Sequence, residues 1–197
     1  MERIIFATHN DGKMREIRKI MEGTGIQVVS AKEAGVRIQA EETGTTFEEN
    51  ARIKAQTVME ATGEIVMADD SGLEVDWLDK APGVYSARFM GEDTGYDIKN
   101  QAIIDALADA PEEKRTARFV CAIACVFPDG RVLQTRETME GVIAHQACGT
   151  GGFGYDPIFF LPDRGCTSAE LTTEGKNAIS HRGKALRAMK ELLEGQI

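Results

Sequence analysis

The stretch EIVMADDSGLEVD, residues 64–76, decides how the fold of this chain is interpreted. Its apolar run 65–68 predicts a short buried strand, which leads into two adjacent carboxylates, Asp69 and Asp70, and then into a Ser-Gly pair that is typical of a turn. Adjacent residues of an extended strand point to opposite faces. We therefore expect one carboxylate to contact a metal ion and the other to orient ligands or water, unless the acids merely begin an ordinary turn.

Alternating strand and helix patterns precede this stretch. The periodicity predicts a strand over 4–8, a helix over 11–22, a strand over 26–30 and a helix over 45–61. The last of these helices opens with a Thr-x-x-Glu capping box, and its apolar face carries Phe47, Ala51, Ala55 and Val58. Alternation of this kind predicts a βαβ core.

The second half of the chain predicts longer apolar strands. We expect a helix over 95–109, a hairpin with strands 117–127 and 131–144, a strand over 158–161 and a final helix over 179–195. In that final helix the expected cap is Ser180, the stop is Gly195, and the inward residues are Ile179, Leu186, Met189 and Leu193. The whole pattern predicts a mixed α/β fold in a single domain, 1–197, with a second, β-rich lobe at roughly 110–175.

Composition excludes several classes of partner. A formal net charge of −9 and a pI near 4.9 disfavour polymeric nucleic acid and anionic membranes. No stretch approaches the length of a membrane-spanning helix, and we expect a cytoplasmic protein. The four cysteines lack paired CxxC spacing, so no zinc site is expected, and Cys121 and Cys125 in an apolar run are expected to be small buried hydrophobes.

The segment ATHNDGKMRE, 7–16, is a candidate anion site. A helix that begins near Asp11 directs free backbone N–H groups and the positive end of its dipole to one place. Lys13 in the first turn opposes the dipole, which favours a shared anion such as phosphate. The alternative is a solvated lysine beside an asparagine cap.

One lysine on an apolar helix face and a second pair of adjacent carboxylates are the next candidate site residues. Lys54 lies seven residues after Phe47, on the apolar stripe of its helix, so its ammonium needs a partner unless the side chain extends past the core to solvent. Glu41 and Glu42 form a second acidic pair. Paired hard oxygen ligands suit Mg²⁺, which typically keeps several waters and bridges to phosphates.

The stretch CGTGGFGYDPIFFLP, 148–162, contains a formal GxGxxG pattern, but a strand rather than a helix is predicted after it, so no dinucleotide site is expected. Glycines would instead let the backbone approach a flat ligand, with Phe153 or Tyr155 for stacking and Asp156 as an acceptor. The alternative is a flexible connection.

The segment TTEGKNAISHRGKALR, 172–187, brings basic groups to the start of the last helix, namely Lys176, His181 and Arg182. Arg182 can donate to a carbonyl oxygen of a base. A solvated basic patch is the alternative.

Together these groups describe a nucleotide pocket suited to phosphoryl transfer to water. The ordered motifs ATHNDGK, EETGTTFEENARIKA, ADDSGLEVD, APGVYSAR, GTGGFGYDPIF and AISHRGKAL resemble those of the inosine/xanthosine triphosphate pyrophosphatase family, the Ham1-like enzymes, over essentially the whole chain. The resemblance implies an elongated mixed sheet with two α/β lobes and an active-site cleft between them. It also implies a Mg²⁺-dependent homodimer that splits ITP, dITP and XTP into the monophosphate and pyrophosphate.

The resemblance also assigns roles to individual residues. The implied triphosphate ligands are Thr8, Asn10, Lys13 and Lys54, and the neighbouring residues His9, Asp11 and Gly12 are further implied substrate contacts. The implied metal ligands are Glu42 and Asp70, with Glu41 a further acid beside them, Asp70 also the catalytic base, and Asp69 acting through its neighbours. The implied contacts to the substrate next to Asp70 and around the base are Ser71, Phe153, Gly154, Tyr155, Asp156, Lys176, His181 and Arg182. Many family members have glycine where this chain has His9.

Two other functions compete with this interpretation. One is a nucleotide-binding module without chemistry, which would lack an acid or a lysine, and both are present here. The other is a Maf-like pyrophosphatase that acts on pyrimidine or modified nucleotides.

Overall fold

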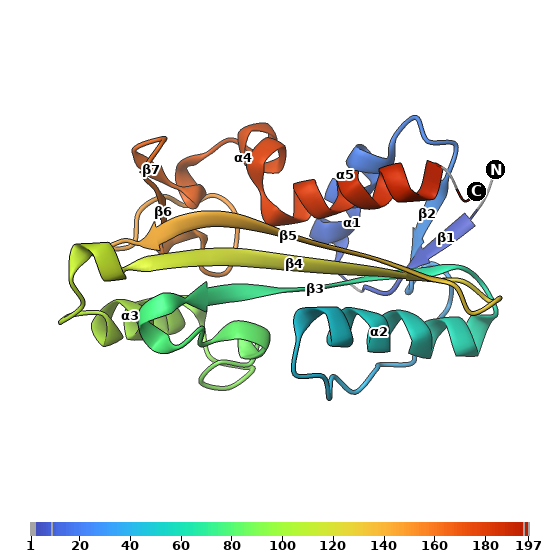
Figure 1. The fold of residues 1–197 in the computed structure, drawn as a ribbon, viewed down its shortest axis with the longest axis horizontal. Coiled ribbons are helices and arrows are strands. Elements are labelled where there is room, and N and C mark those ends of the chain that lie inside the picture. The colour runs from blue at the N-terminus through green and yellow to red at the C-terminus, as the bar shows by residue number, and fades with distance from the viewer. Residues whose placement is uncertain (1–2, 9, 195, 197) are drawn as a thin grey trace. The chain divides into compact units, whose positions relative to one another are not determined.

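The fold is a mixed sheet with helices packed against it. In the computed structural model, which describes residues 3–8, 10–194 and 196, seven strands follow the order β2-β1-β3-β4-β5-β6-β7 (Figure 1). The strands are β1 (Arg3–Phe6), β2 (Gln27–Ser30), β3 (Val66–Val75), β4 (Thr116–Val126), β5 (Val132–Ile143), β6 (Phe159–Leu161) and β7 (Cys166–Thr167). β1 pairs in parallel with β2 and β3, whereas β6 pairs antiparallel with β5 and β7. The predicted mixed α/β class is confirmed.

Five α-helices accompany the strands in the described part of the chain. They are α1 (Asp11–Met21), α2 (Phe47–Thr62), α3 (Tyr96–Ala106), α4 (Thr173–Ile179) and α5 (His181–Glu194). Short 3₁₀ turns lie at Asp76–Leu78, Gly83–Tyr85, Glu112–Lys114, Asp156–Ile158 and Ser168–Glu170. None of the described helices is long and apolar enough to cross a membrane.

The chain divides into two compact units. Unit 1 comprises residues 1–70, 121–137 and 182–197, and unit 2 comprises residues 71–120 and 138–181. The strands β3, β4 and β5 contribute residues to both units. Each unit has a hydrophobic cluster of its own, and each is described by itself below.

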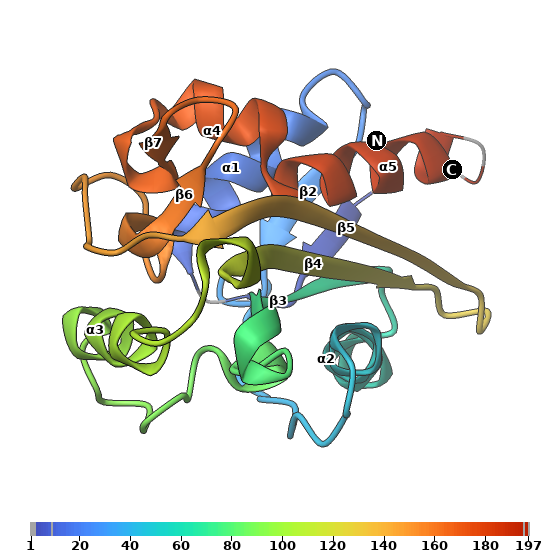
Figure 2. The same cartoon turned by 60° about the vertical axis from the view of Figure 1, so that its left-hand side comes forward.

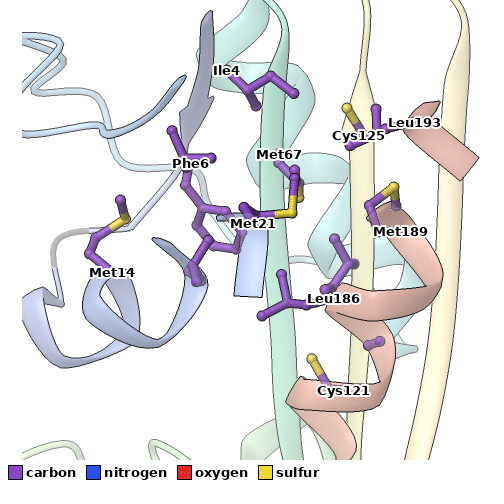
Figure 3. Packing of buried hydrophobic residues seen from close by; sticks show 14 of the residues in the cluster. Ile4, Phe6, Met14, Met21, Met67, Cys121, Cys125, Leu186, Met189 and Leu193 are labelled. Atoms are coloured by element: carbon purple, nitrogen blue, oxygen red, sulfur yellow. The ribbon is translucent and has the colours of Figure 1, made fainter. Parts of the chain in front are cut away.

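In unit 1 the core lies between the sheet and the pair of helices α1 and α5. Leu186, Met189 and Leu193 of α5 point toward the strands, where they meet Cys121 and Cys125 of β4 (Figure 3). Both cysteines are buried and unbridged, as predicted for small hydrophobes, and burial raises the pKa of the Cys125 thiol to about 12. α2 covers the opposite face of the sheet in this unit (Figure 1).

In unit 2, α3 and α4 lie on opposite sides of the strands (Figure 2). The cluster joins apolar residues of α3 with β4, β5 and β6. Arg115 is buried beside it and donates hydrogen bonds to the carbonyl oxygens of Leu107, Ile143 and Ala144 at 2.8, 2.9 and 3.1 Å. These bonds tie the end of α3 to the end of β5, because a buried guanidinium must satisfy its donors.

The prediction that the third strand stops before a Ser71–Gly72 turn is wrong. β3 continues through both residues to Val75, with Leu73 and Val75 buried and Glu74 partly exposed. This alternation extends the strand through the Ser-Gly pair, beyond Val66 and Met67, the two residues that pair with β1. The two aspartates therefore lie within a strand rather than at its tip.

The final predicted helix is confirmed as α5 (His181–Glu194), which begins directly after the expected cap Ser180, and a separate short helix, α4, precedes it. The backbone at Ser180 is extended, with φ −65° and ψ 151°, so this residue ends α4 and directly precedes α5. Ile179 consequently packs against the cluster of unit 2, not on the stripe formed by Leu186, Met189 and Leu193. The expected stop, Gly195, lies outside the described residues.

The predicted capping box at the start of α2 is confirmed and generates a stability prediction. Thr46 Oγ1 accepts from the Glu49 backbone N–H at 3.1 Å, and the Glu49 carboxylate accepts from the Thr46 N–H at 3.2 Å. We expect Thr46→Ala to lower the free energy of unfolding by about 1 kcal/mol, because an N-cap acceptor is lost. Urea denaturation checks this value. Thr46→Ser keeps the hydroxyl and is expected to retain stability, and equal losses in both variants would contradict the capping role.

Candidate active site

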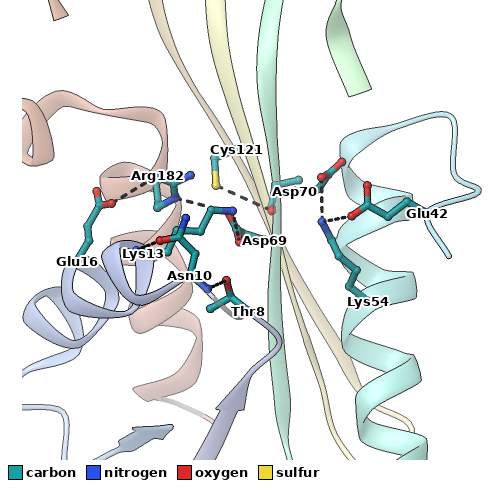
Figure 4. A network of polar contacts seen from close by, with 11 residues as sticks. Thr8, Asn10, Lys13, Glu16, Glu42, Lys54, Asp69, Asp70, Cys121 and Arg182 are labelled. Carbon is teal, nitrogen blue, oxygen red and sulfur yellow. Dashed lines mark hydrogen bonds and ion pairs between the residues drawn. The ribbon is translucent and has the colours of Figure 1, made fainter. Parts of the chain in front are cut away.

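Asp69 and Asp70 lie on β3 and face opposite sides of the sheet. Lys13 and Arg182 reach Asp69 from one side, whereas Lys54 reaches Asp70 from the other (Figure 4). All five residues belong to unit 1. Strand alternation thus separates two like charges that are adjacent in the sequence, as predicted, and gives each carboxylate its own cations.

On the first side the charges form a chain that begins at Asp69. Lys13 Nζ lies 3.1 and 3.0 Å from the two carboxylate oxygens of Asp69. Arg182 Nε lies 3.5 Å from Asp69 Oδ2, and Arg182 Nη1 donates to Glu16 Oε2 at 3.3 Å. Burial raises the pKa of Asp69, but the charges of Lys13 and Arg182 outweigh it and hold that pKa well below the usual range. Asp69 is therefore a stable counter-ion that aligns two cations.

The N-terminus of α1 is built by the residues before it. Asn10 Oδ1 accepts from the Lys13 backbone N–H at 3.0 Å, so Asn10 is the helix cap, and Thr8 Oγ1 accepts from the Asn10 N–H at 3.2 Å. The alternative of a solvated lysine beside an asparagine cap is right about the cap and wrong about Lys13, which is ion-paired. Asp11 and Gly12 are the first residues of α1. His9 lies outside the described residues.

On the second side Lys54 joins two acids. Its Nζ lies 3.0 Å from Asp70 Oδ1 and 2.9 Å from Glu42 Oε1. The alternative that Lys54 extends past the core to solvent is therefore wrong. Burial lowers the pKa of this ammonium, but the nearby aspartates outweigh it, so the pKa of Lys54 is raised.

Asp70 is less well compensated than its neighbour. Burial raises its pKa, and the repulsion of Glu42 and Asp69 adds to that rise, so that the charge of Lys54 is insufficient to cancel it. Its second oxygen, Oδ2, is buried without a hydrogen-bond partner among the described residues. A buried acceptor of this kind costs free energy until something binds it.

These residues suit a hard divalent cation. Asp70 and Glu42 are two carboxylates sharing one ammonium, and the unpaired Asp70 oxygen supplies a ligand atom of the type that Mg²⁺ prefers. Within the described ranges no group of three His, Cys, Asp or Glu side chains forms a ready-made cage. Two acids plus waters and phosphate oxygens is the usual composition of a magnesium site. Glu41 is exposed, and its role at such a site stays a prediction.

The Gly-rich loop lies in unit 2 and presents one aromatic ring. Of the two predicted stacking residues, Phe153 is 57% exposed, whereas Tyr155 is only 4% exposed. The Tyr155 hydroxyl donates to the carbonyl oxygen of Ser86 at 2.6 Å, and its ring meets Tyr96 edge-on with centroids 5.2 Å apart. Phe153 is thus the residue that can stack on a flat ligand.

Asp156 holds this loop together. It is buried, and its Oδ2 accepts from the Phe153 N–H at 2.8 Å and from the ammonium of Lys176. Its Oδ1 accepts from Ser168 Oγ at 2.6 Å. Lys176 Nζ lies 5.1 Å from the centroid of the Phe153 ring. The predicted acceptor Asp156 therefore accepts hydrogen bonds from groups of the protein itself. It also holds the Lys176 ammonium beside the exposed Phe153 ring.

The glycines of the loop are required by close packing. A Cβ atom on Gly152, whose φ is +69°, would lie 2.1 Å from Asp156 Oδ2, and one on Gly151 would lie 2.7 Å from the carbonyl oxygen of Ala169. Real side chains never approach so closely, so only glycine fits. Two glycines of the formal GxGxxG pattern, Gly149 and Gly151, thus reflect packing against the backbone of Ala169, whereas the third, Gly154, has φ +67° and only ordinary contact with Tyr96.

The remaining predicted residues are divided between the units. Lys176 lies in α4, not at the start of the last helix. His181 is buried in unit 2 with its ring stacked on Phe119 at 5.0 Å, and Ser71 lies partly buried on β3 in the same unit. Arg182 belongs to unit 1, where it pairs with Asp69.

Several polar residues of the site were missed in the sequence. Asn50 lies one helical turn before Lys54, and its Oδ1 accepts from the Gly44 N–H at 2.8 Å, which anchors the loop after Glu42. Its signal was a polar residue on the buried side of α2 next to Ala51. Lys99 gave a similar signal, being four residues before Ile103 on the buried side of α3. Two others, Glu16 and Ser168, carried no pattern that would have indicated their contacts.

Comparison with known proteins shows the family of this chain. The profile of the Ham1 family matches residues 4–192. The chain belongs to the Ham1 family. It is 49% identical over 191 residues to a dITP/XTP pyrophosphatase of Exiguobacterium sibiricum, covering 97% of this chain and 96% of that protein. It is 46% identical over 194 residues to the dITP/XTP pyrophosphatase of Bacillus subtilis, covering 98% of each.

Solved structures of Ham1 proteins share the fold. A Ham1 protein from Coxiella burnetii superposes with a TM-score of 0.93 at 39% identity, covering 99% of this chain and all of that one. The Staphylococcus aureus Ham1 protein gives a TM-score of 0.91 at 38% identity over the full length of both chains. The predicted family is thus confirmed by both sequence and fold.

The adjacent aspartates should respond oppositely to the same substitution. Asp69→Asn is expected to lower the free energy of unfolding at pH 7.5 by about 3 kcal/mol, because two buried cations lose their counter-ion. Asp70→Asn is expected to leave stability equal or higher, because a carboxyl with a raised pKa destabilises the folded state once it ionises. Thermal unfolding in EDTA compares the two variants.

The pH dependence of stability follows from the directions of these pKa shifts. Because the pKa of Asp69 is lowered in the folded state, its contribution to the free energy of unfolding is complete above the pKa of an unfolded-state aspartate. That contribution is lost as the pH falls toward the folded-state pKa. The gap between wild type and Asp69→Asn should therefore narrow on acidification. A larger loss for Asp70→Asn than for Asp69→Asn would show that this assignment of charges is wrong.

Proposed function

We propose that this protein hydrolyses dITP, XTP and ITP to the nucleoside monophosphate and pyrophosphate with Mg²⁺, and so removes deaminated purines from the nucleotide pool. The observation that carries the proposal is the buried, unpaired oxygen of Asp70 beside Lys54 and Glu42. Its relatives named dITP/XTP pyrophosphatases match this chain over nearly its full length and support the choice of substrate.

The phosphate end of the substrate is assigned to unit 1. Lys13, Lys54 and the N-terminus of α1 supply positive charge for the triphosphate, with Thr8 and Asn10 shaping the approach. When bound, Mg²⁺ held by Asp70 and Glu42 would neutralise charge on the phosphate oxygens. Lys54 lies between these two acids in the structure, and with the cation bound its ammonium would be available to the triphosphate.

Hydrolysis requires a base that accepts a proton from water. The oxygen of the attacking water forms a bond to the phosphorus next to the ribose, and the bond from that phosphorus to the pyrophosphate oxygen breaks. Asp70 is assigned to take the proton, because its carboxylate has an oxygen with no hydrogen-bond partner among the described residues. Asp69 keeps Lys13 and Arg182 in place while this occurs.

The base end is assigned to unit 2 together with Arg182. Phe153 offers the stacking surface, and Lys176 lies beside its ring. Lys176, His181 and Arg182 are the proposed donors to the base edge, and Gly154 and Ser71 are proposed contacts. The proposal also includes an active-site cleft between two lobes and one catalytic domain over 1–197. It further includes a homodimer and a cytoplasmic location.

A substrate panel tests this function. ITP, dITP and XTP are expected to be hydrolysed with release of pyrophosphate, whereas ATP, GTP, dTTP and UTP are expected to be poor substrates. Phosphate and pyrophosphate are assayed separately. Preferred hydrolysis of dTTP or UTP would indicate a Maf-like enzyme instead, and nucleotide binding without turnover would indicate a binding module.

The role of Asp70 has its own test. We expect Asp70→Asn to lower kcat for dITP by about 10²-fold or more, because base and metal ligand are lost together. The matched control is Glu60→Gln, an exposed acid of α2, which should leave kcat unchanged. Steady-state kinetics at saturating Mg²⁺ measures both, and wild-type turnover by the Asp70 variant would refute the assignment.

A further inference from the structure

Two neighbouring residues of α3 are polar and yet buried. Lys99 is 1% exposed and Asn100 is 4% exposed. Lys99 Nζ donates to the carbonyl oxygen of Ala87 at 2.7 Å, and Asn100 Nδ2 donates to the carbonyl oxygen of Gly154 at 3.1 Å. Burying such groups is costly unless they are bonded. One turn of α3 thus holds the backbone of two separate loops within unit 2.

The bond from Asn100 fixes the peptide between Gly154 and Tyr155, one residue after the exposed ring of Phe153. Gly154 has φ +67° and follows Phe153 directly. Tyr155, on its other side, is fixed by its hydroxyl and its ring, and the Phe153 N–H is fixed by Asp156. The Gly154 carbonyl is the point between these anchors where a glycine backbone could otherwise rotate.

The amide of Asn100 is not optimised for stability. Its Oδ1 is buried with no hydrogen-bond partner in the described part of the chain. An unpaired buried acceptor destabilises a protein, and an apolar side chain of similar shape would avoid that cost. The useful part of the side chain is therefore the Nδ2 donor toward Gly154.

We propose that Asn100 is a positioning residue that holds the Phe153 ring ready to stack on the purine base. This inference rests on the proposed function, in which Phe153 receives the base. Without the bond, the peptide of Gly154 must be ordered each time a base binds. Ordering a loop on binding weakens affinity, here by about five- to tenfold. The loss should affect ligands that carry a base and spare those that carry only phosphate.

The two reaction products separate these contributions. IMP carries the base, whereas pyrophosphate carries none. Both are measured as inhibitors of ITP hydrolysis by the wild type, Asn100→Asp and Asn100→Leu. We expect the inhibition constant of IMP and the KM for ITP to rise about five- to tenfold, with kcat within about twofold and the pyrophosphate constant unchanged. Asn100→Asp should show the larger effect, because its carboxylate would face a carbonyl oxygen.

Gln101 provides the matched control on the same helix. Its side chain is exposed, and its Nε2 donates to Asp105 Oδ1 at 2.8 Å on the same helix. Gln101→Glu and Gln101→Leu change charge and size as the Asn100 variants do. Both are expected to leave every constant within about twofold of wild type, since they do not touch the loop.

Several results would overturn the inference. An unchanged IMP constant in a folded Asn100→Leu protein would do so, as would a parallel rise for IMP and pyrophosphate. Failure of both Asn100 variants to fold, while the Gln101 variants fold, would show a purely structural role. Absence of ITP turnover by the wild type would instead refute the proposed function, and IMP binding measured by calorimetry would then still report on Asn100.

Discussion

The alternation of side chains along β3 is the constraint on which the site depends. Because consecutive residues of a strand face opposite sides, Asp69 and Asp70 meet different helices although they are neighbours in the chain. One carboxylate is paired with two cations and has a lowered pKa, and the other retains an unpaired oxygen and a raised pKa. A single strand thus supplies both a fixed counter-ion and a reactive acid.

Much of this arrangement could be predicted because local patterns encode it. The capping box at Thr46 and the lysine on the apolar stripe of α2 each follow from helical spacing. The partners of these groups could not be predicted, because pairs such as Arg182 and Glu16 are distant in sequence. The turn expected at Ser71 is absent because this residue lies within the strand Val66–Val75, where the strand context overrides the local turn preference of a Ser-Gly pair.

The loop of unit 2 shows a different organisation. Asp156 accepts hydrogen bonds from Phe153, Ser168 and Lys176 and so connects three segments through one buried carboxylate. Sequence reasoning treated it as a group that faces the ligand, since a short motif does not reveal which way a side chain turns. The carboxylate instead holds the residues that surround it.

The close contact at Gly152 limits how this loop can evolve. A single added methyl group there would collide with the carboxylate that organises the segment, whereas Phe153 next to it points outward. A substitution at Gly152 is therefore expected to disrupt the loop, whereas a substitution of Phe153 changes the stacking surface and leaves the backbone of the loop in place. Packing thus fixes the backbone of the loop, and the exposed aromatic side chain is the part whose replacement can change ligand preference.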